Sequence, residues 1–227
     1  MPSSLKEQWS EFDWEKELRK DDERVNVYFR ELPKYIDLPG EDEVICKSIQ
    51  RRRDLAPHGS EWPFHAPGSE PAEPDDSPET EEERKRWDSE WQKREGAETY
   101  ILCGRIARDL CTIFSEKSPD VKTSRNLMRA LCLVGKMMAR STDLIELEPG
   151  ELPALRVALC KRLASDANDI LGILDSFEPA DADSDEILGS AYAGVHEARE
   201  QVLDILANAR KPQKPPRFGT EEDEAPL

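Results

Sequence analysis

The sequence predicts an all-α protein whose main body is an up-and-down four-helix bundle. Apolar residues recur at the three- and four-residue spacing of amphipathic helices in four successive segments between residues 78 and 210. Short polar connections separate these segments, and no alternating strand pattern of useful length competes with them. Successive helices joined by short connections pack antiparallel, which favours a bundle with coiled-coil-like contacts between its helices.

The N-terminal region, residues 1–55, is expected to be a helical but broken extension that precedes the bundle. Ser4 can cap a first helix that carries an apolar stripe. A charged run over residues 19–24 interrupts this stripe, and helical spacing then resumes up to the Pro-Gly pair at 39–40. A shorter helix is expected over residues 41–53, because its acidic start and its arginine-rich end both suit the helix dipole.

Two further segments have the composition of disordered chain. Residues 56–77 contain five prolines and become strongly acidic in their second half. Prolines at this density are incompatible with helices and sheet ladders, so a disordered acidic linker is expected there. The polar segment over residues 211–227 is expected to be a disordered tail.

The first bundle helix is predicted to begin at Pro78, after a serine cap, and to run to Ser115. Gly96 weakens its middle, since glycine is a poor helix former. A second Ser-Pro signal at 118–119 starts the next helix, whose apolar stripe ends before an expected loop near residues 141–150.

The third and fourth bundle helices follow the same pattern. The third carries an apolar stripe from Leu152 to Phe177. An acidic, turn-forming loop comes next, and Ser184 is the expected cap of the fourth helix, which runs to Ala209. Small residues on several stripes would allow neighbouring helices to approach closely, so one continuous core is expected in the bundle.

The charge and the thiols restrict the partners and the compartment. A formal net charge of -17 repels nucleic acid and anionic lipid surfaces at long range. The expected partners are therefore proteins, basic ones included, or further copies of this chain, with no nucleic acid and no membrane. There is no secretory signal and no apolar run long enough for a membrane span. The five scattered cysteines indicate reduced thiols in a cytoplasmic protein.

The sequence offers little for metal or cofactor chemistry. The three histidines are His58, His65 and His196, and none belongs to the Glu-x-x-His pairs of di-iron bundles. His196 and Glu200 stand four residues apart and could chelate an ion, but a solvated pair also explains them. No Cys-x-x-Cys is present. We expect no catalytic, cofactor or metal residues and keep a metal-binding bundle as an alternative function.

The run Arg-Asp-Leu-Ala-Pro-His, from Arg53 to His58, places an arginine and a histidine with four residues between them. This spacing resembles the signature of the HEPN class of helical ribonucleases. The resemblance implies that Arg53 and His58 would act together on RNA phosphodiesters within a helical bundle. Pro57 and Gly59 depart from that arrangement, because they place the motif at a helix end outside the four bundle segments. A ribonuclease is the second alternative function.

The distribution of tryptophan is the most informative functional pattern. All five tryptophans precede the apolar core: Trp9, Trp14, Trp62, Trp87 and Trp91. Trp87 and Trp91 are neighbours on one face of a charged half-helix, where an exposed pair of large rings is uncommon. They could pack against the N-terminal rings as a second small core, or anchor a partner. The leading hypothesis is a non-catalytic interaction protein, such as an adaptor, inhibitor or assembly subunit, whose partner-binding residues are Trp87, Trp91, Trp9 and Trp14.

Overall fold

The structure, a computed structural model, confirms that the protein is all-α. It describes residues 8–35, 38–56, 81–116, 121–148, 150–178 and 181–211, of which 81–84, 87 and 116 are described by their backbone alone. Over these residues the chain forms seven α-helices, labelled α2 to α8, and one short 3-10 helix, η1, with no strand. The predicted linker and tail lie largely outside the described residues, as does Ser4.

The N-terminal helix α2 spans Glu11–Tyr35 without a break. Ser10 caps it, because the Asp13 backbone N–H donates to Ser10 Oγ at 3.3 Å and the Ser10 backbone N–H donates to Asp13 Oδ2 at 3.0 Å. The charged run over residues 19–24 interrupts the apolar stripe, as expected, but it does not break the helix. Within this run Asp22 pairs with Arg140 and Arg162 of later helices, as described below.

The second helix of this region, α3, spans Glu41–Gln50, and η1 spans Arg53–Leu55. The predicted helix over residues 41–53 is therefore shorter than expected, because the backbone at Arg52 is extended. The three elements close on a small separate core made of Val27, Ile45, Ile49 and Leu55, with Tyr28, Leu32 and Tyr35 packed around it.

The predicted single helix from Pro78 to Ser115 is wrong in its middle. The described part consists of two helices, α4 at Glu81–Trp91 and α5 at Ala97–Glu116. The chain changes direction at Gly96, where φ is +92°. A Cβ atom there would lie only 3.0 Å from the carbonyl oxygen of Ser141, so glycine satisfies both the left-handed backbone and the close approach to the next helix.

The remaining helices are α6 at Val121–Glu146, α7 at Pro153–Leu174 and α8 at Ala182–Ala209. The loop predicted near residues 141–150 begins later, because Ser141 is buried and donates to the Met137 carbonyl at 2.8 Å within a continuing helix. The cap of α8 is Asp181 and not the predicted Ser184, whose backbone N–H donates to Asp181 Oδ1 at 2.8 Å.

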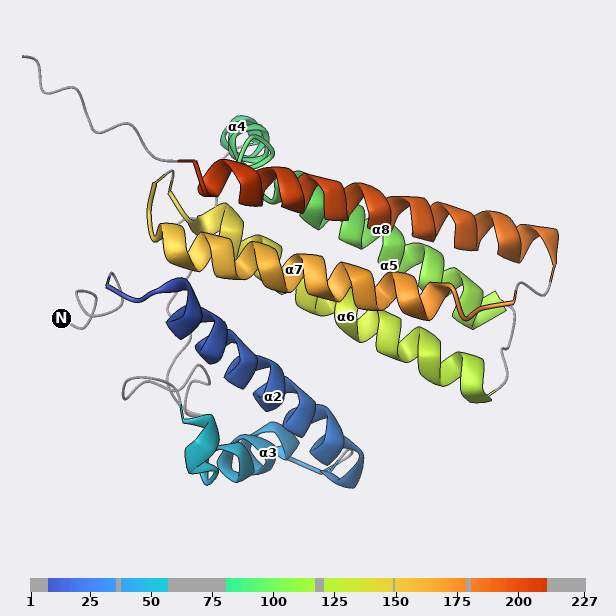
Figure 1. Cartoon of the computed structure of the whole chain (residues 1–227). Coiled ribbons are helices and arrows are strands. Elements are labelled where there is room, and N and C mark those ends of the chain that lie inside the picture. The colour runs from blue at the N-terminus through green and yellow to red at the C-terminus, as the bar shows by residue number, and fades with distance from the viewer. Residues whose placement is uncertain are drawn as a thin grey trace, which may run out of the picture.

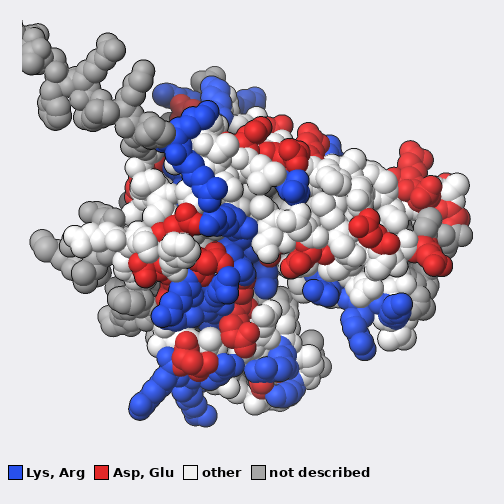
Figure 2. Space-filling model, in the orientation of Figure 1, with Lys and Arg blue, Asp and Glu red and all other residues white. Residues whose placement is uncertain are grey.

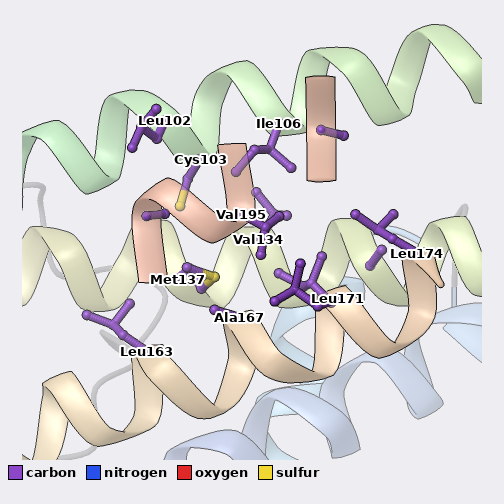
Figure 3. Packing of buried hydrophobic residues seen from close by; sticks show 14 of the residues in the cluster. Leu102, Cys103, Ile106, Val134, Met137, Leu163, Ala167, Leu171, Leu174 and Val195 are labelled. Carbon is purple, nitrogen blue, oxygen red and sulfur yellow. The ribbon is translucent and has the colours of Figure 1, made fainter. Parts of the chain in front are cut away.

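Helices α5 to α8 surround one core. Helix α5 packs against α6 and α8, and α7 packs against the same two helices (Figure 1). All four helices supply buried apolar side chains to a single cluster, including Ile106 of α5, Met137 of α6, Leu163 of α7 and Val195 of α8 (Figure 3). Helix α2 lies outside this group and packs on α7, with α3 on its other side.

Candidate functional site

The two N-terminal tryptophans of the predicted partner site lie together. Trp9 and Trp14 have ring centroids 4.7 Å apart, with their planes inclined by 60°. Trp14 is buried at the first turn of α2, with 9% of its surface exposed, while Trp9 is half-buried. This pair covers the start of α2 and leaves only the Trp9 ring partly available to a partner.

The second tryptophan pair lies on α4. Trp91 is half-buried and meets Tyr100 of α5 edge to face, with ring centroids 5.5 Å apart. The side chain of Trp87 lies outside the described part, although its backbone belongs to α4. The contact with Tyr100 therefore ties the end of α4 to α5 across the turn at Gly96.

The structure does not bring these tryptophans into one core. Helices α2 and α4 lie on opposite sides of α7 and α8 (Figure 1). The small N-terminal core is formed by aliphatic residues such as Ile45 and Ile49, not by the tryptophans that we expected to fill it. The role of Trp9, Trp14, Trp87 and Trp91 in binding a partner stays a prediction.

An ion-pair network between α2, α6 and α7 is the strongest polar feature of the described residues. The Asp22 carboxylate of α2 accepts hydrogen bonds from Arg140 of α6 and Arg162 of α7, and Lys136 Nζ lies 3.5 Å from it. Arg140 also donates to Asp166 of α7. We call Asp22, Lys136, Arg140, Arg162 and Asp166 the Asp22 network. Its side chains are between 7% and 19% exposed.

Burial shapes the electrostatics of this network. Removal from water lowers the pKa of Arg140, and nearby carboxylates including Glu15 oppose that effect. Burial, followed by the neighbouring Arg140 charge, lowers the pKa of Lys136. Glu15 Oε1 lies 3.5 Å from Arg162 Nη1 and adds a third carboxylate to balance the three cations. Because these cations are held by carboxylates of the same chain, the network fastens α2 to α6 and α7.

The sequence contains a weak signal for this network that we missed. Arg140 and Asp166 lie at positions flanked by buried apolar neighbours, between Met137 and Leu144 on α6 and between Leu163 and Ala167 on α7. Charged residues on a buried stripe need partners of the opposite sign. The partner on α2 lies 118 residues away in sequence from Arg140, so only the fold reveals it.

Two adjoining cavities lie where the α4–α5 turn meets the α6–α7 connection. They have volumes of about 270 and 150 Å³ and share Glu95 and Arg156 in their walls. The Arg156 guanidinium is buried, pairs with Glu95, and donates to the carbonyls of Leu147 at 3.2 Å and Glu148 at 2.9 Å. Through these bonds Arg156 holds the α6–α7 connection in place. Lys93 lines the larger cavity.

The nucleophilic side chains do not form a reactive centre in the described part of the chain. Burial raises the pKa of Cys103 and of Cys160 to about 12, so both thiols stay protonated at neutral pH. Cys111 is exposed. His196 is exposed and stacks beside Tyr192, with ring centroids 4.8 Å apart.

The described residues contain no group of histidine, cysteine, aspartate and glutamate side chains that could hold a metal ion. The other two histidines, His58 and His65, lie outside the described residues. Arg53 belongs to η1, at the edge of the small N-terminal core. The ribonuclease and metal-binding alternatives therefore stay predictions.

A second surface becomes visible only in the fold. We call it the α2–α6 face and define it by Val25 and Phe29 of α2 and by Arg125, Arg129 and Leu133 of α6. Val25 is 37% exposed and Phe29 is 51% exposed, which is unusual for an apolar pair on neighbouring turns. Arg125 and Arg129 are also exposed. Figure 2 shows lysine and arginine side chains along the lower edge of the molecule, around α2 and α3 and below α6.

Comparisons with known protein families, with curated proteins and with solved structures find no match for this chain. Among the helices that the structure describes, none is long and apolar enough to cross a lipid bilayer.

Proposed function

We propose that this protein is a non-catalytic helical interaction protein, an adaptor, inhibitor or assembly subunit that binds another protein. In this proposal α5 to α8 form an up-and-down four-helix bundle that serves as a rigid support. The N-terminal helices and α4 carry the binding surfaces on it. The five cysteines are all free thiols, which is consistent with action in the cytoplasm.

One observation carries the proposal. Leu18 packs against the main core, and the same side of α2 continues to Val25 and Phe29, which stay 37% and 51% exposed in the described part of the chain. Exposed apolar side chains grouped beside charged ones are typical of protein interfaces. The half-buried rings of Trp9 and Trp91 add aromatic side chains of the kind that most often anchor a partner.

The proposal is tested by affinity purification of the tagged full chain from its own cells. Mass spectrometry identifies the proteins that co-purify. The variant with Trp87→Ala and Trp91→Ala is expected to lose the main partner, because two anchor rings are removed at once.

Val121→Ala is the matched control, since Val121 is 78% exposed at the start of α6 and far from α4 (Figure 1). Circular dichroism verifies that each variant remains folded. Unchanged co-purification by the double variant would remove Trp87 and Trp91 from the binding surface. The absence of any specific partner would contradict the proposed function itself.

A further inference from the structure

The α2–α6 face continues the side of α2 that pairs with α6 and α7. Along α2, Leu18 packs against the main core and Asp22 pairs with Arg140 and Arg162. Val25 and Phe29 follow these two residues by seven positions each, and seven residues are almost two full helical turns. They therefore lie on the side of α2 that faces the other helices.

Helix α6 has the matching register. Lys136 and Arg140 both reach Asp22 of α2. Arg129 and Leu133 precede them by seven positions, so they lie on the same side of α6. Arg129 is exposed, and among the described residues no carboxylate lies within ion-pair distance of it.

The two helices do not close on each other here. Helix α2 packs on α7, α3 and η1, and Figure 1 shows its C-terminal half running away from α6 and α7. Val25 and Phe29 continue the side of α2 that packs on the other helices, yet they remain 37% and 51% exposed. Helix α2 offers apolar side chains on this face, and α6 offers arginines. A binding partner should therefore carry apolar and acidic side chains.

We propose that the α2–α6 face binds an acidic amphipathic helix of a partner protein. This inference rests on the proposed function and names the class of partner. A helix placed between two diverging helices can lay its apolar side on Phe29 and Val25, the usual mode of helix-in-groove recognition. Its carboxylates then meet Arg125 and Arg129, whose planar guanidinium groups bind carboxylates in two-point geometry.

The local charge favours this occupant over the alternatives. The chain as a whole carries a net charge of -17 and would favour basic partners, but this face has the opposite sign. On α7 the same side carries one carboxylate, Asp169, seven positions after Arg162, so the arginines of α6 outnumber it. A nucleic acid strand could use the same arginines and stack a base on Phe29, but it would leave the aliphatic Val25 without an apolar partner, whereas an amphipathic helix covers both side chains.

A peptide-binding experiment tests the inference on the full chain. The probe is a fluorescein-labelled helical peptide with leucine on one side and glutamate and glutamine on the other, measured by fluorescence anisotropy. A peptide with lysine in place of glutamate and a single-stranded DNA oligonucleotide serve as the comparison probes. The glutamate peptide is expected to bind saturably, more weakly as salt increases, and in preference to both comparison probes.

Variants assign the binding to this face. Phe29→Ala and Arg129→Glu should each weaken binding of the glutamate peptide about tenfold or more, as expected for a central anchor residue. Phe12→Ala is the matched control, because Phe12 is 79% exposed and lies on a different side of α2. Thermal unfolding should be unchanged in all three variants, since the replaced side chains are exposed.

The inference is overturned if the glutamate peptide does not bind, if both variants bind it like the wild type, or if DNA binds more tightly. It is also overturned if light scattering shows a dimer that Phe29→Ala dissociates, because the occupant is then a second copy. The proposed function has its own test, the co-purification of a specific partner. If the peptide tests fail while the tagged chain still co-purifies a partner, only the assignment of this face is wrong.

Discussion

Replacing Asp22 by alanine is the most direct test of how the N-terminal helices are held. The Asp22 carboxylate is the point where α2, α6 and α7 meet, since it accepts from Arg140 and Arg162 and lies beside Lys136. The substitution leaves α2 intact as a helix, because alanine is a better helix former than aspartate. It removes the counter-charge of three largely buried cations. The loss of stability therefore comes from contacts between helices and not from the helix itself.

The size of the effect follows from burial. Removing one partner of a fully buried ion pair costs about 3–5 kcal/mol, because the other charge is left without compensation. Arg140 is 8% exposed and keeps Asp166, while Arg162 and Lys136 are 19% and 18% exposed and still reach some water. We therefore expect Asp22→Ala to lower the free energy of unfolding by about 3 kcal/mol, the lower end of that range. For a chain of this size this corresponds to a fall of about 6–12 °C in Tm.

Thermal and urea unfolding of wild type and Asp22→Ala measure this difference. Arg86→Ala is the control, since Arg86 and Glu90 form an ion pair on α4 with side chains 82% and 58% exposed. An exposed pair contributes about 0.5 kcal/mol or less, so this control should unfold almost like the wild type. Hydrogen exchange should place the loss of protection first in α2. Equal stability of Asp22→Ala and Arg86→Ala would refute the view that the network fastens α2.

Two further predictions concern the α4–α5 turn and the thiols. Gly96→Ala should destabilise the protein by about 2 kcal/mol or more, because φ is +92° and the new Cβ would lie 3.0 Å from the Ser141 carbonyl oxygen. Urea unfolding measures the loss of stability. A stability equal to that of the wild type would show that the turn relaxes around the new side chain. In the native protein iodoacetamide should modify Cys111 well before Cys103 and Cys160, which are buried and whose pKa burial raises to about 12. Mass spectrometry of timed samples would contradict this if the three thiols reacted at similar rates.

The helices could be predicted from the sequence because their stabilisation comes from repeated apolar side chains on one face, and that pattern is local. What could not be predicted depends on residues far away in sequence. The run over residues 19–24 interrupts the apolar stripe, and only the fold shows that Arg140 and Arg162 supply counter-charges to its Asp22. Gly96 is visible as a weak helix position, but only the nearby Ser141 of α6 explains why the chain turns there.

The candidate site could be predicted only in part for the same reason. Tryptophans in charged segments are a local signal, and the structure leaves the rings of Trp9 and Trp91 half-buried. The α2–α6 face depends on the angle between α2 and α7, which no spacing in the sequence specifies. Val25 and Phe29 look like ordinary core positions in the sequence, yet the fold leaves them 37% and 51% exposed.

The use of charges to attach α2 has a consequence for binding. An apolar contact between helices tolerates sliding and rotation, whereas a buried carboxylate that must meet Arg140 and Arg162 at once is satisfied in one register. That register also determines where Phe29 stands relative to Arg129, since both lie seven positions from members of the network. A partner helix that needs both residues therefore needs Asp22 as well, although Asp22 itself is turned inward and is only 12% exposed.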